Sequence, residues 1–166
     1  MKKRKIIFGV LSLLWCVMIF TYSAMDDTNS EMRSYFVGRV IYRTFHPDFV
    51  QLDTVTQNEL VMGIDHYVRK GAHMAEFAVL AVLLFGTVLP PLKEIGKREI
   101  FMNALLAFVL AVFYAATDEF HQLFVPGRAG MLRDVCIDSC GILIGLLGCM
   151  AYTVIRKKQC RGIKYE

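Results

Sequence analysis

Ionisable side chains occur in three short segments that adjoin long apolar runs, and their spacing indicates a shared site. In the first segment, His73 and Glu76 are three residues apart and Arg69 precedes His73 by four, so one helix face can carry all three. The apolar run that follows extends to Leu89. An ionisable side chain inside a membrane span costs roughly 2.5–3.5 kcal/mol on insertion scales, so each such residue requires an explanation.

The other two segments place polar residues on helix faces that also carry small side chains. The second face carries Asp118, His121 and Gln122 and is continued by Ala115, Ala111, Ala107 and Ala104. The third face carries Asp134 and Asp138 and is continued by Gly141, Gly145 and Gly148. Small residues let helices approach closely, so the pattern predicts helices that pack together with their polar residues at one end. The glycine-bearing segment 126–133 is expected to lie over those residues as a lid.

These residue types suit proton transfer beside a group that binds anions. Glu76 or Asp118 would be the general base, with His121 or His73 as its proton partner. Arg128 and Arg133, both in the lid, would hold a phosphate or a carboxylate. The remaining candidates for substrate binding are Arg69, Lys70, Glu119, Gln122, Asp134 and Asp138.

No cofactor is expected from the sequence. A divalent metal held by His73, Glu76, Asp118 and His121 is an alternative, although no zinc-type spacing such as His-x-x-x-His is present. The five cysteines fall mostly inside apolar runs. That placement is typical of small buried side chains and not of a disulfide framework.

Composition identifies the elements that must position these residues. Of the 166 residues, 55% are apolar and 20% are charged, and the mean hydropathy is +0.44. This excludes a disordered or collagen-like chain, and Lys and Arg form no patch with aromatic residues that would indicate nucleic-acid binding. Four apolar stretches, at about 6–24, 71–89, 100–117 and 135–155, approach the roughly 20 residues that cross a bilayer. The expected fold is one all-α integral membrane domain, 1–166, with outer loops 25–70 and 118–134.

Basic residues indicate the orientation of these spans. Twelve Lys and Arg residues, Lys93 and Lys164 among them, fall on the side of both termini, and seven fall on the other side. The positive-inside rule then predicts a multi-pass protein with both termini in the cytoplasm. The first stretch follows Lys2–Lys5 and is expected to be an uncleaved span instead of a signal peptide.

The first outer loop is long enough to carry structure of its own. Apolar residues recur there at helical spacing opposite Arg33 and Arg43, namely Met32, Tyr35, Phe36, Val40 and Ile41. This predicts an amphipathic helix that lies on the outer surface. The run Thr56-Gln57-Asn58-Glu59 fits a capping box, so a second helix is expected to begin there and to continue into the second span.

The three polar motifs resemble those of the VanZ family of bacterial membrane proteins. They read Arg69-Lys70-x-x-His73-x-x-Glu76, Asp118-Glu119-x-His121-Gln122-x-Phe124-x-Pro126-Gly127-Arg128 and Arg133-Asp134-x-x-x-Asp138-x-x-Gly141. The resemblance runs from the second span to the end of the fourth. It implies a bacterial plasma-membrane protein of about four helices and, for the founding member, a link to teicoplanin-type glycopeptide resistance.

Two functions of different classes follow, and the sequence leaves both open. The chain is either an enzyme that modifies a lipid-linked envelope molecule at the outer leaflet or a protein that binds such a molecule or a membrane lipid without chemistry. A structural role is the further alternative, in which ion pairs such as Arg133–Asp138 or Arg69–Glu76 only lock the helix bundle. An ion pathway is disfavoured because the inner halves of the spans carry no polar cluster. The oligomeric state is not indicated.

Overall fold

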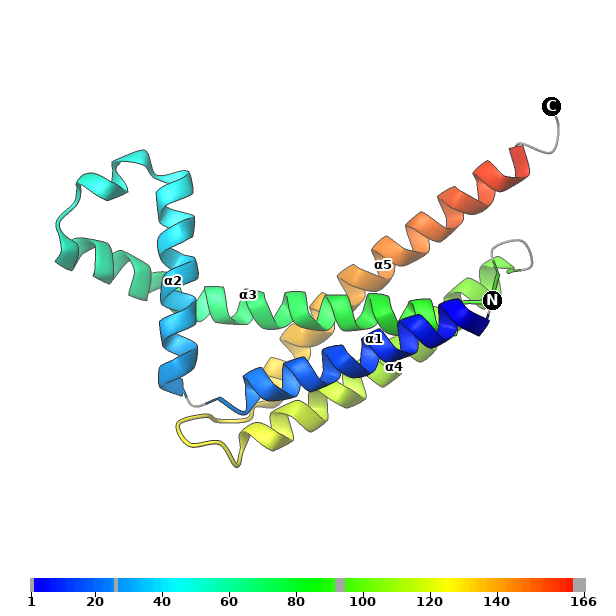
Figure 1. Cartoon of the computed structure of the whole chain (residues 1–166), viewed down its shortest axis with the longest axis horizontal. Helices are drawn as coiled ribbons and strands as arrows, with labels where there is room; N and C mark the ends of the chain where they lie inside the picture. Colours follow the sequence, from blue (N-terminus) through cyan, green and yellow to red (C-terminus); the bar gives the residue numbers. More distant parts are fainter. Residues whose placement is uncertain (1, 26, 92–94, 163–166) are drawn as a thin grey trace.

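The computed structural model describes residues 2–25, 27–91 and 95–162, together with the helical backbone but not the side chains of 27–29 and 160–162. Within those residues the chain is all-helical (Figure 1). The elements are α1 (Lys2–Ser23), α2 (Asp27–Phe45), the 3₁₀-helix η1 (Pro47–Gln51), α3 (Thr54–Val88), α4 (Lys97–Gln122) and α5 (Leu132–Gly162). The all-α fold expected from the sequence is confirmed.

Four of these helices are long and apolar enough to cross a membrane, as the sequence predicted: α1, α3, α4 and α5. Their outward faces carry large exposed apolar side chains such as Leu13, Val17, Phe113, Ile144 and Leu147. Exposure of such a surface to water is unfavourable, whereas its contact with lipid tails is favourable. Lys93 and Lys164, counted above for the orientation, lie outside the described residues.

Helix α3 is longer than any single span requires. Its 35 residues rise about 52 Å, whereas a hydrocarbon core is about 30 Å thick. The helix therefore continues well beyond the bundle, where α2 packs on it and η1 packs on α2 (Figure 1). The sequence correctly predicted that the helix entering the second span begins within the loop 25–70.

The predicted start of that helix was wrong by a few residues. The N-cap is Asp53, whose carboxylate accepts hydrogen bonds from the backbone N–H groups of Val55 and Thr56, each at 3.0 Å. The Thr56 hydroxyl also donates to Asp53, at 2.6 Å. Thr56 therefore lies inside the first turn of α3 and is bound by the N-cap Asp53. Its capping-box pattern does not mark the N-terminus of the helix.

Small residues bring the long helices into close contact. The alanine face of α4 (Ala104, Ala107, Ala111 and Ala115) is buried. A Cβ atom built on Gly141 of α5 would lie 2.1 Å from the backbone oxygen of Met74 in α3, and one on Gly145 would lie 2.5 Å from that of Ala78. Helices α3 and α5 thus touch through their backbones, immediately beside His73 and Glu76.

Helix α2 runs crosswise to α3 at the end of the bundle (Figure 1). It packs on α3 through Gly38, where a built Cβ would lie 2.9 Å from Cγ1 of Val61. Ser34 donates a hydrogen bond to Asp65, and Arg39 Nη2 donates to Gln57 Oε1 at 3.1 Å. Met32 and Phe36 are exposed on the other side. The helix predicted in this loop is present, and its position on a membrane surface stays a prediction.

The opposite end of the bundle is held together by basic side chains. Arg4 of α1 donates to the backbone oxygen of Leu89, which caps α3. Lys157 of α5 donates to the backbone oxygen of Ile95, just before α4. The start of α1, the connection between α3 and α4 and the end of α5 therefore lie at one end, and the polar motifs lie at the other.

Candidate functional site

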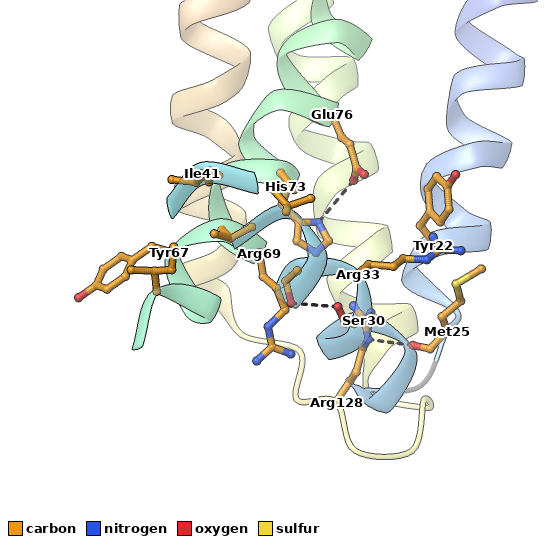
Figure 2. Close-up of a pocket in the computed structure, with 16 residues that line it drawn as sticks. Tyr22, Met25, Ser30, Arg33, Ile41, Tyr67, Arg69, His73, Glu76 and Arg128 are labelled. Carbon is orange, nitrogen blue, oxygen red and sulfur yellow. Dashed lines mark hydrogen bonds and ion pairs between the residues drawn. The ribbon is translucent and has the colours of Figure 1, made fainter. Parts of the chain in front are cut away.

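The polar face of α3 forms one wall of a cavity near α2. Nδ1 of His73 lies 3.8 Å from Oε2 of Glu76, and Figure 2 shows the two side chains pointing towards each other. The indole Nε1 of Trp15 in α1 donates to the backbone oxygen of Glu76 at 2.9 Å. His73 Nδ1 is buried and has no hydrogen-bond partner among the described residues.

This larger cavity has a volume of about 670 Å³. Most of its lining is apolar, and three arginines, Arg33, Arg69 and Arg128, contribute to it together with His73 and Glu76. The other lining residues are Tyr22, Met25, Ser30, Ser34, Val37, Ile41, Ile64, Tyr67, Val68, Gly71 and Ala72. Arg33 of α2 reaches across it, with its Cζ 4.6 Å from the centre of the Tyr22 ring (Figure 2).

Arg128 closes the larger cavity from the segment between α4 and α5. Its Nε donates to the backbone oxygen of Met25 at 3.0 Å, and its Nη2 donates to the Ser30 hydroxyl. Gly127 precedes it with φ 78°, a conformation that favours glycine. Gly130 follows, and a Cβ built there would lie 2.1 Å from the backbone oxygen of Glu119. Glycine at both positions lets this segment fold tightly back over α4.

A smaller cavity of about 260 Å³ is lined by residues of that segment together with α3, α4 and α5. Its acidic lining residues are Glu119, Asp134 and Asp138. Lys70 of α3 forms an ion pair with Asp134 Oδ2, and the backbone N–H of Met131 donates to Glu119 Oε2 at 2.9 Å. The remaining lining residues are His66, Arg69, Lys70, His73, Gln122, Gly127, Arg128, Ala129, Met131 and Arg133.

Asp138 is the most isolated of these carboxylates. It is 2% exposed, and no hydrogen bond or ion pair joins it to any residue that the structure describes. The alternative pair Arg133–Asp138 is therefore not formed between these two described residues. Arg133 is exposed and lines only the smaller cavity.

Asp118 and His121 lie behind the cavities and line neither of them. Gln122 Nε2 donates to Asp118 Oδ2 at 3.1 Å and to the Ser23 hydroxyl at 3.0 Å, which ties α4 to the end of α1. The His121 ring packs on Phe20, with ring centres 4.4 Å apart. Asp118 Oδ1 and His121 Nε2 are buried without a hydrogen-bond partner among the described residues.

The sequence-based site residues therefore fall into three groups. His73, Glu76, Arg69 and Arg128 line the larger cavity. Lys70, Glu119, Gln122, Arg133, Asp134 and Asp138 line the smaller one, which also includes Arg69, His73 and Arg128. Asp118 and His121 support the site from α4. Within the described residues, no group of three or more His, Cys, Asp or Glu side chains is placed to hold a metal ion.

Sequence reasoning did not identify the residues that α1 and α2 contribute. Arg33 was assigned only to the polar face of a surface helix, whereas it lines the larger cavity. Ser30, Ser34, Val37 and Ile41 line it as well. Their spacing of three and four residues around Arg33 is the signal that α2 presents one continuous face to the cavity.

Comparison with known proteins identifies one family. A family model described as VanZ/LLP1 matches residues 8–155 of this chain, which is nearly its whole length. No curated protein and no solved structure matches the chain.

Proposed function

The chain belongs to the VanZ/LLP1 family, and we propose that it binds a lipid-linked molecule of the cell envelope at the outer leaflet of a bacterial plasma membrane. In this proposal both termini are cytoplasmic, since the basic clusters of α1 and α5 lie at the end of the bundle opposite the cavities. The cavities then open in the outer half of the membrane.

The lining of the larger cavity is the observation that carries this proposal. Its walls are mainly apolar, yet Arg33, Arg69 and Arg128 all contribute to it. Apolar walls are suited to a hydrocarbon chain, and guanidinium groups are suited to a phosphate or carboxylate. A molecule that carries both, an anionic amphiphile, matches this combination better than a purely polar ligand does.

The single tryptophan provides a direct test of binding. Because Trp15 donates to the backbone of Glu76, its fluorescence should respond when the larger cavity is filled. The experiment titrates dodecyl phosphate into the protein in phosphatidylcholine nanodiscs. We expect saturable binding that weakens about tenfold in Arg128→Gln, since a hydrogen bond to a charged group contributes about 1.5–3 kcal/mol.

Arg43→Gln is the matched control, because Arg43 is an arginine of α2 that is exposed and does not line the cavity. This variant should bind dodecyl phosphate like the unmodified protein. Absence of saturable binding in the unmodified protein would reject the proposal.

Modification of the bound molecule is a second candidate, favoured by the pair His73 and Glu76. The 3.8 Å contact between them lies in the wall of the cavity that also holds the arginines. Proton transfer between this pair and a bound molecule is the chemistry that the site can support. Asp118 and His121 would then be positioning residues, since neither lines a cavity.

We extend the proposal to teicoplanin-type glycopeptide resistance. A Gram-positive host that produces the protein should show reduced susceptibility to teicoplanin and unchanged susceptibility to vancomycin. Glu76→Gln at the same membrane level should lose this effect, whereas Glu59→Gln should keep it, because Glu59 is exposed and outside both cavities. If the unmodified protein changes susceptibility to neither drug, this part of the proposal is rejected.

The structural alternative has support of its own from Lys70 and Asp134, which join α3 to α5. A purely structural role predicts that substitutions in the cavity change only the amount of folded protein. Equal binding by equal amounts of folded Arg128→Gln and unmodified protein would favour this alternative.

A further inference from the structure

The two cavities meet at a shared wall of basic residues. Arg69, His73 and Arg128 line both the larger and the smaller cavity. A ligand that fills the larger cavity with an apolar chain therefore has its anionic group at this wall, and whatever is attached to that group enters the smaller cavity. The smaller cavity thus determines which head group fits.

The lining of the smaller cavity differs in chemistry from that of the larger one. Its carboxylates Glu119, Asp134 and Asp138 come from α4 and α5. Two of them already have partners, because Glu119 accepts from the Met131 N–H at 2.9 Å and Asp134 Oδ2 is paired with Lys70. Asp138 lines the cavity, is 2% exposed and accepts no hydrogen bond from a described residue.

Asp134 shows the same shortage of donors. Its Oδ1 is buried and has no hydrogen-bond partner among the described residues. A buried carboxylate without a donor is unfavourable, and a charged donor compensates it best. Arg69, Lys70, Arg128 and Arg133 also line this cavity, yet among the described residues Lys70 alone forms an ion pair with one of its three carboxylates. The lack of donors at Asp138 and at Asp134 Oδ1 is the second observation, after the shared wall, that defines the ligand.

We infer that the site takes a zwitterionic amphiphile whose phosphate lies at Arg69 and Arg128 and whose primary amine lies between Asp134 and Asp138. The inference rests on the proposed function, because it assumes that the larger cavity holds the apolar chain. A primary ammonium group brings three donors, which suits the open oxygens of the two aspartates. A quaternary ammonium brings a charge without a donor, and a glycerol head group brings donors without a charge.

Three single-chain probes of the same acyl length separate these properties: lysophosphatidylethanolamine, lysophosphatidylcholine and lysophosphatidylglycerol. Each is titrated into the protein in phosphatidylcholine nanodiscs, and Trp15 fluorescence is followed. We expect the ethanolamine probe to bind about tenfold more tightly than either of the others. This comparison uses the unmodified protein, so it does not depend on whether a variant folds.

Asp138→Asn then tests the residue assigned to the amine. The variant should bind the three probes with affinities within about twofold of one another, since an amide attracts an ammonium group far less than a carboxylate does. Asp48→Asn is the control, because Asp48 is exposed in η1 and lies outside both cavities. It should retain the preference for the ethanolamine probe.

The outcomes distinguish this inference from the proposed function. Binding of dodecyl phosphate without any preference among the three head groups would overturn the inference and leave the proposed function standing. A preference for ethanolamine that persists in Asp138→Asn would overturn the assignment of the amine to Asp138. Absence of binding by all four probes would overturn both.

Discussion

Lys70 of α3 and Asp134 of α5 form an ion pair across the most extensive helix–helix interface among the described residues. The side chains are 25% and 11% exposed, so each has lost most of its hydration in the folded protein. The contact of Gly141 with the Met74 backbone lies about one helical turn beyond Lys70 in α3 and about two turns beyond Asp134 in α5. The ion pair therefore joins the packing of the bundle to the wall of the smaller cavity.

Removing one member of this ion pair should destabilise the protein more than removing both. Lys70→Met leaves the Asp134 carboxylate buried without a partner and should lower stability by about 1–3 kcal/mol. The double variant Lys70→Met/Asp134→Asn should recover part of that loss. Thermal unfolding in detergent measures both, with Lys97→Met as a control at an exposed lysine. A double variant less stable than the single one would contradict this account.

Adding a methyl group at Gly141 should separate the helices. The new Cβ would lie 2.1 Å from the backbone oxygen of Met74, and overpacking of this kind typically costs about 1–3 kcal/mol. Gly141→Ala should therefore lower the unfolding temperature. Gly148→Ala is the matched control in the same helix, because nothing lies within 4 Å of its built Cβ, and there the better helix propensity of alanine should leave stability unchanged or raised.

The cap of α3 should make the start of this helix sensitive to acid. The side-chain and backbone hydrogen bonds from Thr56 lower the pKa of Asp53 below its usual value of 3.8. A lowered pKa in the folded state means that the cap stabilises the helix fully above pH 3.8 and loses this effect as the pH falls through the folded value. The amides of Val55 and Thr56 should then lose protection from hydrogen exchange.

Asp53→Asn provides the comparison, because asparagine caps a helix but does not titrate in this range. At each pH the exchange of the two amides is compared between the variant and the unmodified protein. The difference should change below pH 3.8 and stay constant above it. A difference that is the same over the whole range would show that the carboxylate does not control this end of α3.

Arg128 should hold the segment between α4 and α5 against the start of α2. Arg128→Gln removes the donors to Met25 and Ser30, so hydrogen exchange should rise in residues 126–131 and in the first turn of α2. Arg133→Gln is the control from the adjoining first turn of α5, since Arg133 is exposed. Equal hydrogen exchange of these amides in the two variants would show that Arg128 does not hold the segment against α2.

The sequence predicted well what depends on the period of a single helix. The alanine face of α4 is buried, and Gly141 and Gly145 of the glycine face of α5 contact α3, because a shared face on a helix follows from spacing alone. The grouping of Asp118 with Gln122 followed in the same way and is seen in their hydrogen bond at 3.1 Å. The family resemblance, carried by the same spacing, is confirmed by the match over residues 8–155.

What the sequence could not predict depends on how helices rotate and pack. Asp118 and His121 lie on the expected face of α4, but that face meets α1, so these residues stay behind the cavities. Arg33 enters the larger cavity because Gly38 seats α2 against Val61. The capping box failed for a local reason, since Asp53 caps the helix three residues earlier by accepting from the Thr56 amide and also binds the Thr56 hydroxyl.

The backbone contact between α3 and α5 also determines which part of the site is stiff. At Gly141 and Gly145 no side chain separates the two helices, so neither can slide along the other without a collision, and the smaller cavity keeps its shape. Helix α2 meets α3 through rotatable side chains such as Val61, which can yield. Under the proposed function, the larger cavity would then admit hydrocarbon chains of different length, and selectivity for the head group would come from the smaller cavity.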